Sequence, residues 1–252
     1  MLQVSRINEI RRTIQKNKSV LVSDLAKKYD VTEETIRRDL KQLEKEGILT
    51  RVYGGAYSLE GVQNDVTVRL RKNILSDEKD VIANLCLSFI NDGDSIFLDG
   101  STTASSLAHL ILDKSISVVT NSLMIAQIVS ESTSINLFLI GGKYNGNSMT
   151  FTGTSATEAM KDYYVDKAFL SCRYISMDKG LTDADQEQAL IRKTVIHNCN
   201  HSFLIADHTK LGHNSFYKVA DLREINTFIT NRPIDSDWAR TMGRNQVEVI
   251  FP

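Results

Sequence analysis

Apolar residues near the start of the chain recur at helical spacing. The pattern predicts a first helix capped by Ser5, a short helix over 24–29 capped by Ser23, and a longer helix over 33–46 capped by Thr32. A tight turn separates the second helix from the third. Two helices joined in this way are typical of a helix-turn-helix motif.

The third predicted helix carries a basic face. Its apolar residues share one side, and at about 100° per residue Arg37, Arg38, Lys41 and Lys45 lie on the other. A helix-turn-helix places its second helix, which here is the third predicted helix, in the major groove. The first turns of that helix, which include Thr35, therefore lie nearest the base edges. There an arginine can pair with guanine, while lysines farther along meet phosphates.

The segment after this helix predicts a β-hairpin, which makes the module a winged helix. Leu49 and Val52 flank Arg51, and Gly54 and its glycine neighbour permit a hairpin tip. Arg51 and Tyr53 are expected to contact the DNA backbone or the minor groove. The residues predicted to bind DNA are Thr32, Glu34, Thr35, Arg37, Arg38, Lys41, Arg51, Tyr53 and Gly54. A solvated charged face and a winged helix used for protein contact are the alternatives.

From residue 78 onward, short apolar runs alternate with helical patterns, which favours a mostly parallel sheet covered on both faces. The predicted helices are 78–91, 103–112, 122–132, 154–164, 185–199, 236–242 and one near 217–224. The predicted strands are 95–100, 116–120, 135–142, 167–175, 202–207, 227–230 and 246–251. The fold class is therefore α/β with an added winged helix, divided into residues 1–57, a linker over 58–77, and a domain over 78–252.

Charge is distributed unevenly along the chain. The net charge is −1, but residues 1–56 carry 12 Lys+Arg and 8 Asp+Glu, a net of +4, and the remainder carries a net of −5. This asymmetry favours a small basic module joined to an acidic domain.

Several classes of protein are disfavoured. Three cysteines without a C-x-x-C spacing argue against a disulfide framework or a zinc site, and the pair His197 and His201 reads as a solvated helix end, so no metal or cofactor is expected. No apolar run approaches the length of a membrane span, and the first residues do not resemble a signal peptide. A cytoplasmic protein with no membrane partner is the expectation.

Polar junctions follow three of the predicted strands, and two of the three contain glycine. In a parallel sheet the strand carboxyl ends meet helix N-termini at one edge, where free N–H groups suit a phosphate. Three such junctions favour a binding crevice over caps alone. The residues predicted there are Asp99, Gly100, Ser101, Thr102, Thr103, Thr120, Asn121, Ser122, Gly141, Gly142, Thr152 and Gly153.

A later stretch adds acids at 183–187 and Lys210. Paired carboxylates and a lysine could transfer protons on a sugar phosphate, which is the enzyme alternative. The preferred interpretation is that Asp183 and Asp185 cap the following helix and that Lys210 binds an anionic ligand.

The N-terminal module resembles the DeoR-type bacterial regulators. The resemblance rests on T-I-R-R-D-L at 35–40, L-E at 43–44, Gly47 and R-V-Y-G-G-A at 51–56. It implies sequence-specific operator binding, usually repression.

The second half is similar to the sensor domain of the same family. The matching runs are F-L-D-G-S-T-T at 97–103, V-T-N-S at 119–122, L-I-G-G at 139–142, K-A-F-L at 167–170, G-L-T at 180–182 and I-A-D-H-T-K-L-G at 205–212. The resemblance implies a fold like ribose-5-phosphate isomerase and glucosamine-6-phosphate deaminase, and a phosphorylated sugar held at 101–103. Two departures stand out: S-C-R-Y at 171–174, which could place Arg173 against an anionic group, and E-Q-A at 187–189, where the family often has E-A-E.

Together these patterns predict a transcription regulator, expected to repress a carbohydrate operon. Its expected partners are an operator in double-stranded DNA, a small phosphorylated metabolite and further copies of the chain in a dimer or tetramer. The alternatives are a sugar-phosphate isomerase or deaminase with an accessory winged helix, and an interaction protein that never meets DNA.

Overall fold

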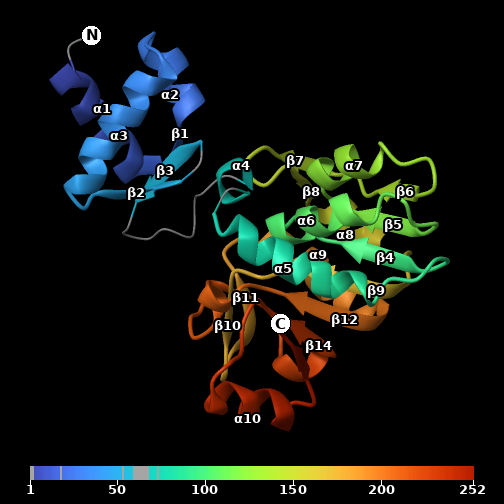
Figure 1. Cartoon of the computed structure of the whole chain (residues 1–252). Coiled ribbons are helices and arrows are strands. Elements are labelled where there is room, and N and C mark those ends of the chain that lie inside the picture. The colour runs from blue at the N-terminus through green and yellow to red at the C-terminus, as the bar shows by residue number, and fades with distance from the viewer. Residues whose placement is uncertain (1–2, 18, 53, 59–67, 73) are drawn as a thin grey trace. The chain divides into compact units, whose positions relative to one another are not determined.

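The structure is a computed structural model that describes residues 3–17, 19–52, 54–58, 68–72 and 74–252 (Figure 1). The chain forms two compact units, Met1–Ser76 and Asp77–Pro252. Each unit has its own hydrophobic core.

The first unit is a winged helix. Its elements are α1 (Gln3–Asn17), β1 (Ser19–Leu21), α2 (Val22–Tyr29), α3 (Glu33–Lys45), β2 (Leu49–Val52), β3 (Gly55–Ser58) and α4 (Val68–Arg71). The three strands form an antiparallel sheet in the order β1-β3-β2, and the β2–β3 hairpin is the wing. The buried side chains of α1, α2 and α3 meet in one cluster that includes Ile10, Ile36 and Leu40. The winged helix-turn-helix fold is confirmed.

Of the three residues predicted to cap a helix N-terminus, one does so and two do not. Thr32 caps α3, because its side chain accepts a hydrogen bond from the N–H of Thr35 at 3.3 Å. Ser5 lies inside α1, so its predicted cap is wrong. Ser23 is also not a cap: α2 begins at Val22, whose N–H donates to the Gly54 carbonyl at 2.8 Å. The chain therefore turns directly from strand pairing into the helix.

The second unit is built on a seven-stranded sheet in the order β15-β14-β12-β9-β4-β5-β6, with every pairing parallel (Figure 1). The strands of this sheet are β4 (Ser95–Leu98), β5 (Ser117–Thr120), β6 (Asn136–Leu139), β9 (Val165–Leu170), β12 (Cys199–Ile205), β14 (Thr227–Ile229) and β15 (Glu248–Ile250). Its α-helices are α5 (Ser76–Leu87), α6 (Thr102–Leu110), α7 (Leu123–Val129), α8 (Thr154–Met160), α9 (Gln186–His197) and α10 (Ser236–Arg244).

The helices cover both faces of this sheet, as predicted. One core cluster joins Ile82 of α5, Leu107 of α6 and Ile125 of α7 to the sheet. The other joins Met160 of α8, Val195 of α9 and Trp238 of α10 to the opposite face. Inner strands such as β4, β5 and β14 are buried on both faces, which explains why their sequences are nearly continuous apolar runs.

Two small sheets flank the main one. Strands β10 (Tyr174–Ser176), β11 (Gly180–Asp183) and β13 (Tyr217–Ala220) form one, and the antiparallel hairpin of β7 (Lys143–Asn145) and β8 (Thr150–Thr152) forms the other. The unit also contains the short 3₁₀ turns η1 (His208–Lys210) and η2 (Leu222–Glu224).

Three sequence predictions are wrong in this region. The helix predicted near 217–224 is β13 followed by η2, because residues 217–220 pair with β11. The strand predicted over 167–175 divides into β9 and β10, which belong to different sheets. The segment 143–152, which lies between a predicted strand and a predicted helix and has no predicted element of its own, contains the β7–β8 hairpin. In the first two cases pairing with distant strands overrides the local pattern, whereas the hairpin pairs within its own segment.

Candidate DNA interface and effector site

The outer face of α3 is charged and open to solvent. The side chains of Arg37 and Arg38 are 51% and 78% exposed, and Lys41 is also exposed. Arg37 pairs with Glu33 at 2.6 Å, and the Nε of Arg38 lies 3.8 Å from Glu34. These acids lie in the first turn, where they stabilise the helix N-terminus and hold both arginines along the helix surface.

A buried ion pair locks α3 to α1. The Nε of Arg6 donates to Asp39 at 2.6 Å, and the two side chains are 7% and 1% exposed. The hydrogen bond to Asp39 raises the pKa of Arg6 above its ordinary value. Sequence reasoning missed this pair, although Asp39 directly precedes buried Leu40 and lies three residues after buried Ile36. The pair fixes the rotation of α3 and therefore the direction in which its basic face points.

The wing is tied to the other end of α3. Both the backbone N–H and the Nε of Arg51 donate to Glu44, at 2.9 and 2.7 Å. The Arg51 side chain hydrogen bond is the main reason that the pKa of Glu44 is lowered. Gly54 has φ 81°, a conformation that favours glycine. Tyr53 lies outside the described residues.

The remaining predicted residues of this interface lie at the start of α3. Thr32 and Glu34 are exposed and Thr35 is half-buried. The hydroxyls of Thr32 and Thr35 are 2.9 Å apart and hydrogen-bonded. The structure thus brings the predicted residues of α3 onto one helix, and places Arg51 and Gly54 on the adjoining wing.

In the second unit, the order in which the chain adds strands to the sheet reverses between β4 and β9. From β4 the chain proceeds to β5 and β6 on one side, and from β9 to β12, β14 and β15 on the other. Ligands of open α/β sheets bind at such a switch point, outside the strand carboxyl ends. Asp99 follows β4 here, Asn121 follows β5 and Ser171 follows β9.

Asp99 organises the switch point. One carboxylate oxygen accepts the N–H of Ser101 at 3.0 Å, and the other accepts the N–H of Ser171 at 3.0 Å and the Nε of Arg192 at 2.8 Å. Arg192 also donates to Asp183 at 2.6 Å. Burial disfavours the charged guanidinium, but Asp183 and Asp99 outweigh it, so the pKa of Arg192 is raised. The sequence did not single out Arg192, because within the helical run E-Q-A-L-I-R at 187–192 it looks like an ordinary exposed cation.

The loop after β4 leads into the N-terminus of α6. Ser101 caps the helix by accepting the N–H of Ala104 at 3.1 Å, and Thr102 and Thr103 form its first turn. All three side chains are buried. The first N–H groups of a helix have no intrahelical partner and carry its positive dipole end, so this turn can hold an anion.

The junction after β5 has the same construction. Thr120 donates to the Leu98 carbonyl at 2.7 Å, and Ser122 caps α7 by accepting the N–H of Ile125 at 3.3 Å. Thr120, Asn121 and Ser122 are at most 1% exposed. The structure therefore brings the predicted residues of the first two junctions together at the edge of adjacent strands.

The β7–β8 hairpin packs against this edge. Phe151 pairs with Asn121 through its backbone N–H at 2.8 Å, and Thr150 accepts a hydrogen bond from the Gln188 amide of α9. Thr150 also lies against Gly100, where an added Cβ would come within 2.2 Å of the Thr150 Cγ2. Only glycine fits this close approach.

The third predicted junction lies along the hairpin. Gly141 and Gly142 are exposed, and a Cβ on Gly142 would lie 2.6 Å from the Thr152 carbonyl. Thr152 donates to Glu187 at 2.7 Å, and Gly153 precedes α8. The hairpin links this group to the α6 junction, because Thr150 of the hairpin lies against Gly100.

Two predicted cations lie at the far side of the switch point. Lys210 donates to the Cys172 carbonyl at 2.7 Å, which ties η1 to the loop after β9. The Arg173 guanidinium lies 5.7 Å from the centre of the Tyr174 ring. Burial raises the pKa of the nearby Cys172 thiol to about 12. The thiol is therefore not a nucleophile at neutral pH.

Asp183 and Asp185 are both predicted to cap α9, and only one of them does. Asp185 caps α9, accepting the N–H groups of Glu187 and Gln188, as predicted. Asp183 does not cap α9: its carboxylate pairs with Arg192 and accepts the Ala184 N–H. His197 lies at the exposed end of α9. Within the described ranges, no group of three His, Cys, Asp or Glu is arranged to hold a metal, and no helix has the length and apolar content to cross a membrane.

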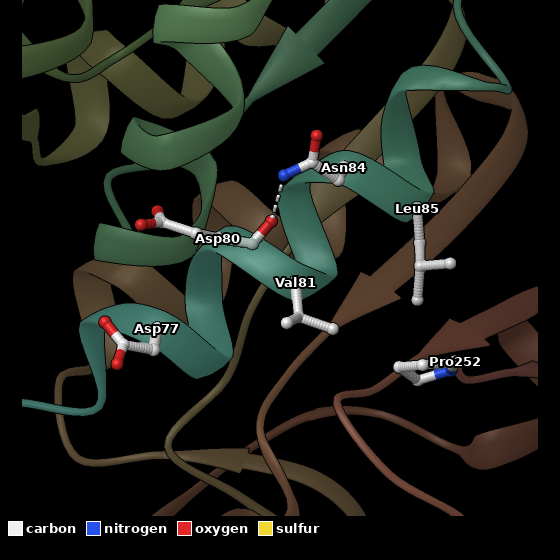
Figure 2. Close-up of a pocket in the computed structure, with 6 residues that line it drawn as sticks. All are labelled: Asp77, Asp80, Val81, Asn84, Leu85 and Pro252. Carbon is white, nitrogen blue, oxygen red and sulfur yellow. Dashed lines mark hydrogen bonds between the residues drawn. The ribbon is translucent and has the colours of Figure 1, made fainter.

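A surface hollow lies apart from all these residues. It follows the outer side of α5 near the chain end, and its lining residues are Asp77, Asp80, Val81, Asn84, Leu85 and Pro252 (Figure 2). The Asn84 amide donates to the Asp80 carbonyl at 2.8 Å beside it. No predicted effector residue lines this hollow, and the strand-end chemistry remains the better guide to the ligand site.

Two family models match the chain. Residues 6–62 match the DeoR-like helix-turn-helix domain, and residues 75–232 match the DeoR C terminal sensor domain. The chain therefore belongs to the DeoR family of helix-turn-helix transcription regulators.

Curated relatives span nearly its whole length. The uncharacterized HTH-type transcriptional regulator YulB of Bacillus subtilis is 34% identical, covering 99% of this chain and 96% of the relative. The HTH-type transcriptional repressor GlcR of the same organism is 32% identical over the same shares. The lactose phosphotransferase system repressor of Staphylococcus epidermidis is 28% identical, covering 92% and 93%.

Solved structures are more distant. A ribose-5-phosphate isomerase in complex with phospho-erythronic acid aligns over 54% of each chain, at 15% identity and a TM-score of 0.40. A similarity at this level supports no inference about function.

Proposed function

We propose that α3 binds in the major groove of an operator and that the protein represses transcription there. Arg37 and Arg38 contact base edges from the first turns, with Thr32, Glu34 and Thr35 beside them, and Lys41 contacts phosphate. Arg51, Tyr53 and Gly54 of the wing contact the backbone or minor groove. The observation that carries the proposal is an exposed basic face on a helix whose rotation is fixed by the buried Arg6–Asp39 pair.

The regulatory ligand in this proposal is a phosphorylated sugar. Its phosphate accepts hydrogen bonds from the N-terminus of α6 at Ser101, Thr102 and Thr103, within the frame set by Asp99. Lys210 and Arg173 add positive charge near the end of β9. A relative named as the lactose phosphotransferase system repressor supports a carbohydrate operon as the target.

We infer that the protein is a regulator without catalytic turnover or a cofactor. An acid–base pair would need a carboxyl group free to take up and release a proton. Asp99 and Asp183 are instead both engaged by the buried Arg192, which donates to each of them. Incubation with a panel of sugar phosphates should therefore give binding without conversion, and any steady turnover would favour the isomerase or deaminase alternative.

The regulator is expected to act in the cytoplasm as a dimer or tetramer. Helix-turn-helix proteins read repeated half-sites with two or more copies of their DNA-binding module. The predicted division into residues 1–57, 58–77 and 78–252 would let two basic modules be presented by one assembly of sensor domains.

DNA binding is tested with the double variant Arg37→Ala, Arg38→Ala in footprinting upstream of the protein's own gene. Each base-reading arginine contributes roughly 1–3 kcal/mol, so operator affinity should fall at least tenfold. Arg12→Ala is the matched control, because Arg12 is 79% exposed on α1, outside the proposed interface. Wild-type affinity in the double variant would contradict the proposal.

The phosphate site is tested by removing a single N–H group. Thr102 is the first residue of α6, where proline is tolerated, and Ser101 has φ −81° and ψ 155°, as a residue before proline requires. Thr102→Pro should keep the fold yet lose most of the thermal stabilisation by sugar phosphates. Thr102→Ala, which keeps the N–H, is the control. Equal stabilisation of wild type and Thr102→Pro would place the phosphate elsewhere.

A further inference from the structure

Three buried polar atoms near the start of α6 have no hydrogen-bond partner within the described part of the chain. They are the Oγ of Ser105, the Oδ1 of Asn121 and the Oγ of Ser171, in residues that are 1%, 1% and 3% exposed. Buried polar atoms in folded proteins are almost always hydrogen-bonded. Three such atoms in one region therefore indicate a missing polar partner.

The three residues lie next to the proposed phosphate loop in the fold. β9, β4 and β5 are adjacent strands, with Leu98 aligned to both Phe169 and Thr120. Asn121 and Ser171 consequently lie on either side of Asp99, at the carboxyl ends of the neighbouring strands. Ser105 lies in the first turns of α6, and its N–H donates to the Ser101 carbonyl at 3.1 Å.

The chemistry of the Asn121 amide identifies the partner. Its Nδ2 donates to the Phe151 carbonyl at 2.9 Å, so the unpaired Oδ1 is left as a pure acceptor. The dianion of a phosphate monoester has only acceptor oxygens and cannot satisfy it. A neutral hydroxyl can, by donating its proton. The Ser171 and Ser105 hydroxyls can donate or accept, and so also suit a polyol.

We infer that Asn121 and Ser171 recognise hydroxyl groups of the effector while the N-terminus of α6 holds its phosphate. This rests on the proposed function and sharpens it. The ligand class is a phosphorylated sugar or polyol with free hydroxyls near its phosphate. A simple phosphate ester without hydroxyls would leave the Oδ1 of Asn121 unpaired and bind more weakly.

The test compares Ser171→Ala and Asn121→Ala with wild type in the full-length protein. The probes are glucose 6-phosphate, fructose 1-phosphate and ribose 5-phosphate, with methyl phosphate as the ester that lacks hydroxyls. Affinities are measured by calorimetry. Ser171→Ala removes only the unpaired oxygen and keeps the N–H that binds Asp99, so it remains informative if Asn121→Ala folds poorly. Ser88→Ala, an exposed site on the same unit, is the matched control.

For the sugar phosphate that binds wild type most tightly, each variant should lose about tenfold in affinity, with methyl phosphate affected less than twofold. An unchanged sugar-phosphate affinity in Ser171→Ala would overturn the inference and assign the unpaired atoms to bound water. An equal loss for methyl phosphate would also overturn it. If no phosphorylated probe binds wild type, the proposed function itself fails, and the inference fails with it.

Discussion

The two units of this protein are each proposed to bind phosphate-bearing ligands, but they do so with different kinds of chemical group. In the winged helix the key groups are long cations in solvent, with Arg38 78% exposed. In the sensor they are short side chains and backbone N–H groups, with Asn121 1% and Thr103 2% exposed. The first unit offers exposed charge, and the second offers mainly a fixed set of dipoles, to which Lys210 and Arg173 add positive charge.

The difference follows from the two ligands. A duplex is met on an open surface, where arginines in solvent-exposed pairs with Glu33 and Glu34 can exchange those partners for phosphate or base. A small metabolite can be enclosed, and there hydrogen bonds are stronger because water is excluded. Rigidity is required in both units, and each has a buried ion pair that supplies it: Arg6–Asp39 in the first unit and Asp99–Arg192 in the second.

The largest effect is expected from breaking the pair that orients α3. Asp39→Ala leaves Arg6 buried without its partner, which costs roughly 3–5 kcal/mol. Circular dichroism should show the winged helix melting early. Fluorescence of Trp238, the single tryptophan and a buried residue of the sensor, should report an unchanged second transition. Arg38→Ala is the exposed control. Equal stability of the two variants would refute the structural role of the pair.

The sensor is expected to be sensitive to a single methyl group. Gly100→Ala places a Cβ only 2.2 Å from the Thr150 Cγ2, and should destabilise the sensor by roughly 1–3 kcal/mol in denaturant titrations. Adding Thr150→Ser removes that methyl, keeps the hydroxyl that Gln188 contacts, and should restore most of the loss. Gly141→Ala is the control, since no atom lies within 4 Å of its added Cβ. A harmless Gly100→Ala would show that the hairpin does not pack tightly there.

The smallest effect concerns the tie between α3 and the wing. Arg51 lowers the pKa of Glu44, so this pair stabilises the fold above the ordinary carboxyl pKa of 4.5 and loses its effect as the pH falls below that value. Both side chains are more than a third exposed, so Glu44→Gln should cost only about 0.2–1 kcal/mol near neutral pH. The difference from wild type should shrink by about pH 3. A pH-independent difference would point to packing instead.

The sequence predicts the organisation of the chain well where pattern is local. The amphipathic stripe of α3, its Thr32 cap and the alternation of strands with helices are all present in the structure. The errors fall where distant residues decide. Ser23 looked like a cap, but the Gly54 carbonyl sets the start of α2, and residues 217–220 became a strand through pairing with β11.

The candidate sites show the same division. The exposed cations of α3 can be predicted from the sequence, because helical geometry alone places them on one face. Arg192 and Asp39 were missed because a buried charge looks like any other charge until its partner is known, 93 residues away for Arg192 and 33 for Asp39. The unpaired oxygen of Asn121 likewise depends on the β8 backbone, which takes the other end of the amide.

The contrast between exposed charge and buried dipoles is tested most directly by salt. Operator affinity and sugar-phosphate affinity would be measured on one preparation across a series of potassium chloride concentrations. Released counterions should make the logarithm of operator affinity fall linearly with the logarithm of salt, with a slope of about −0.9 for each phosphate contacted. The sugar-phosphate affinity should change far less over the same range, because its contacts are enclosed. Operator binding that ignores salt, or effector binding that falls as steeply as operator binding, would contradict this account.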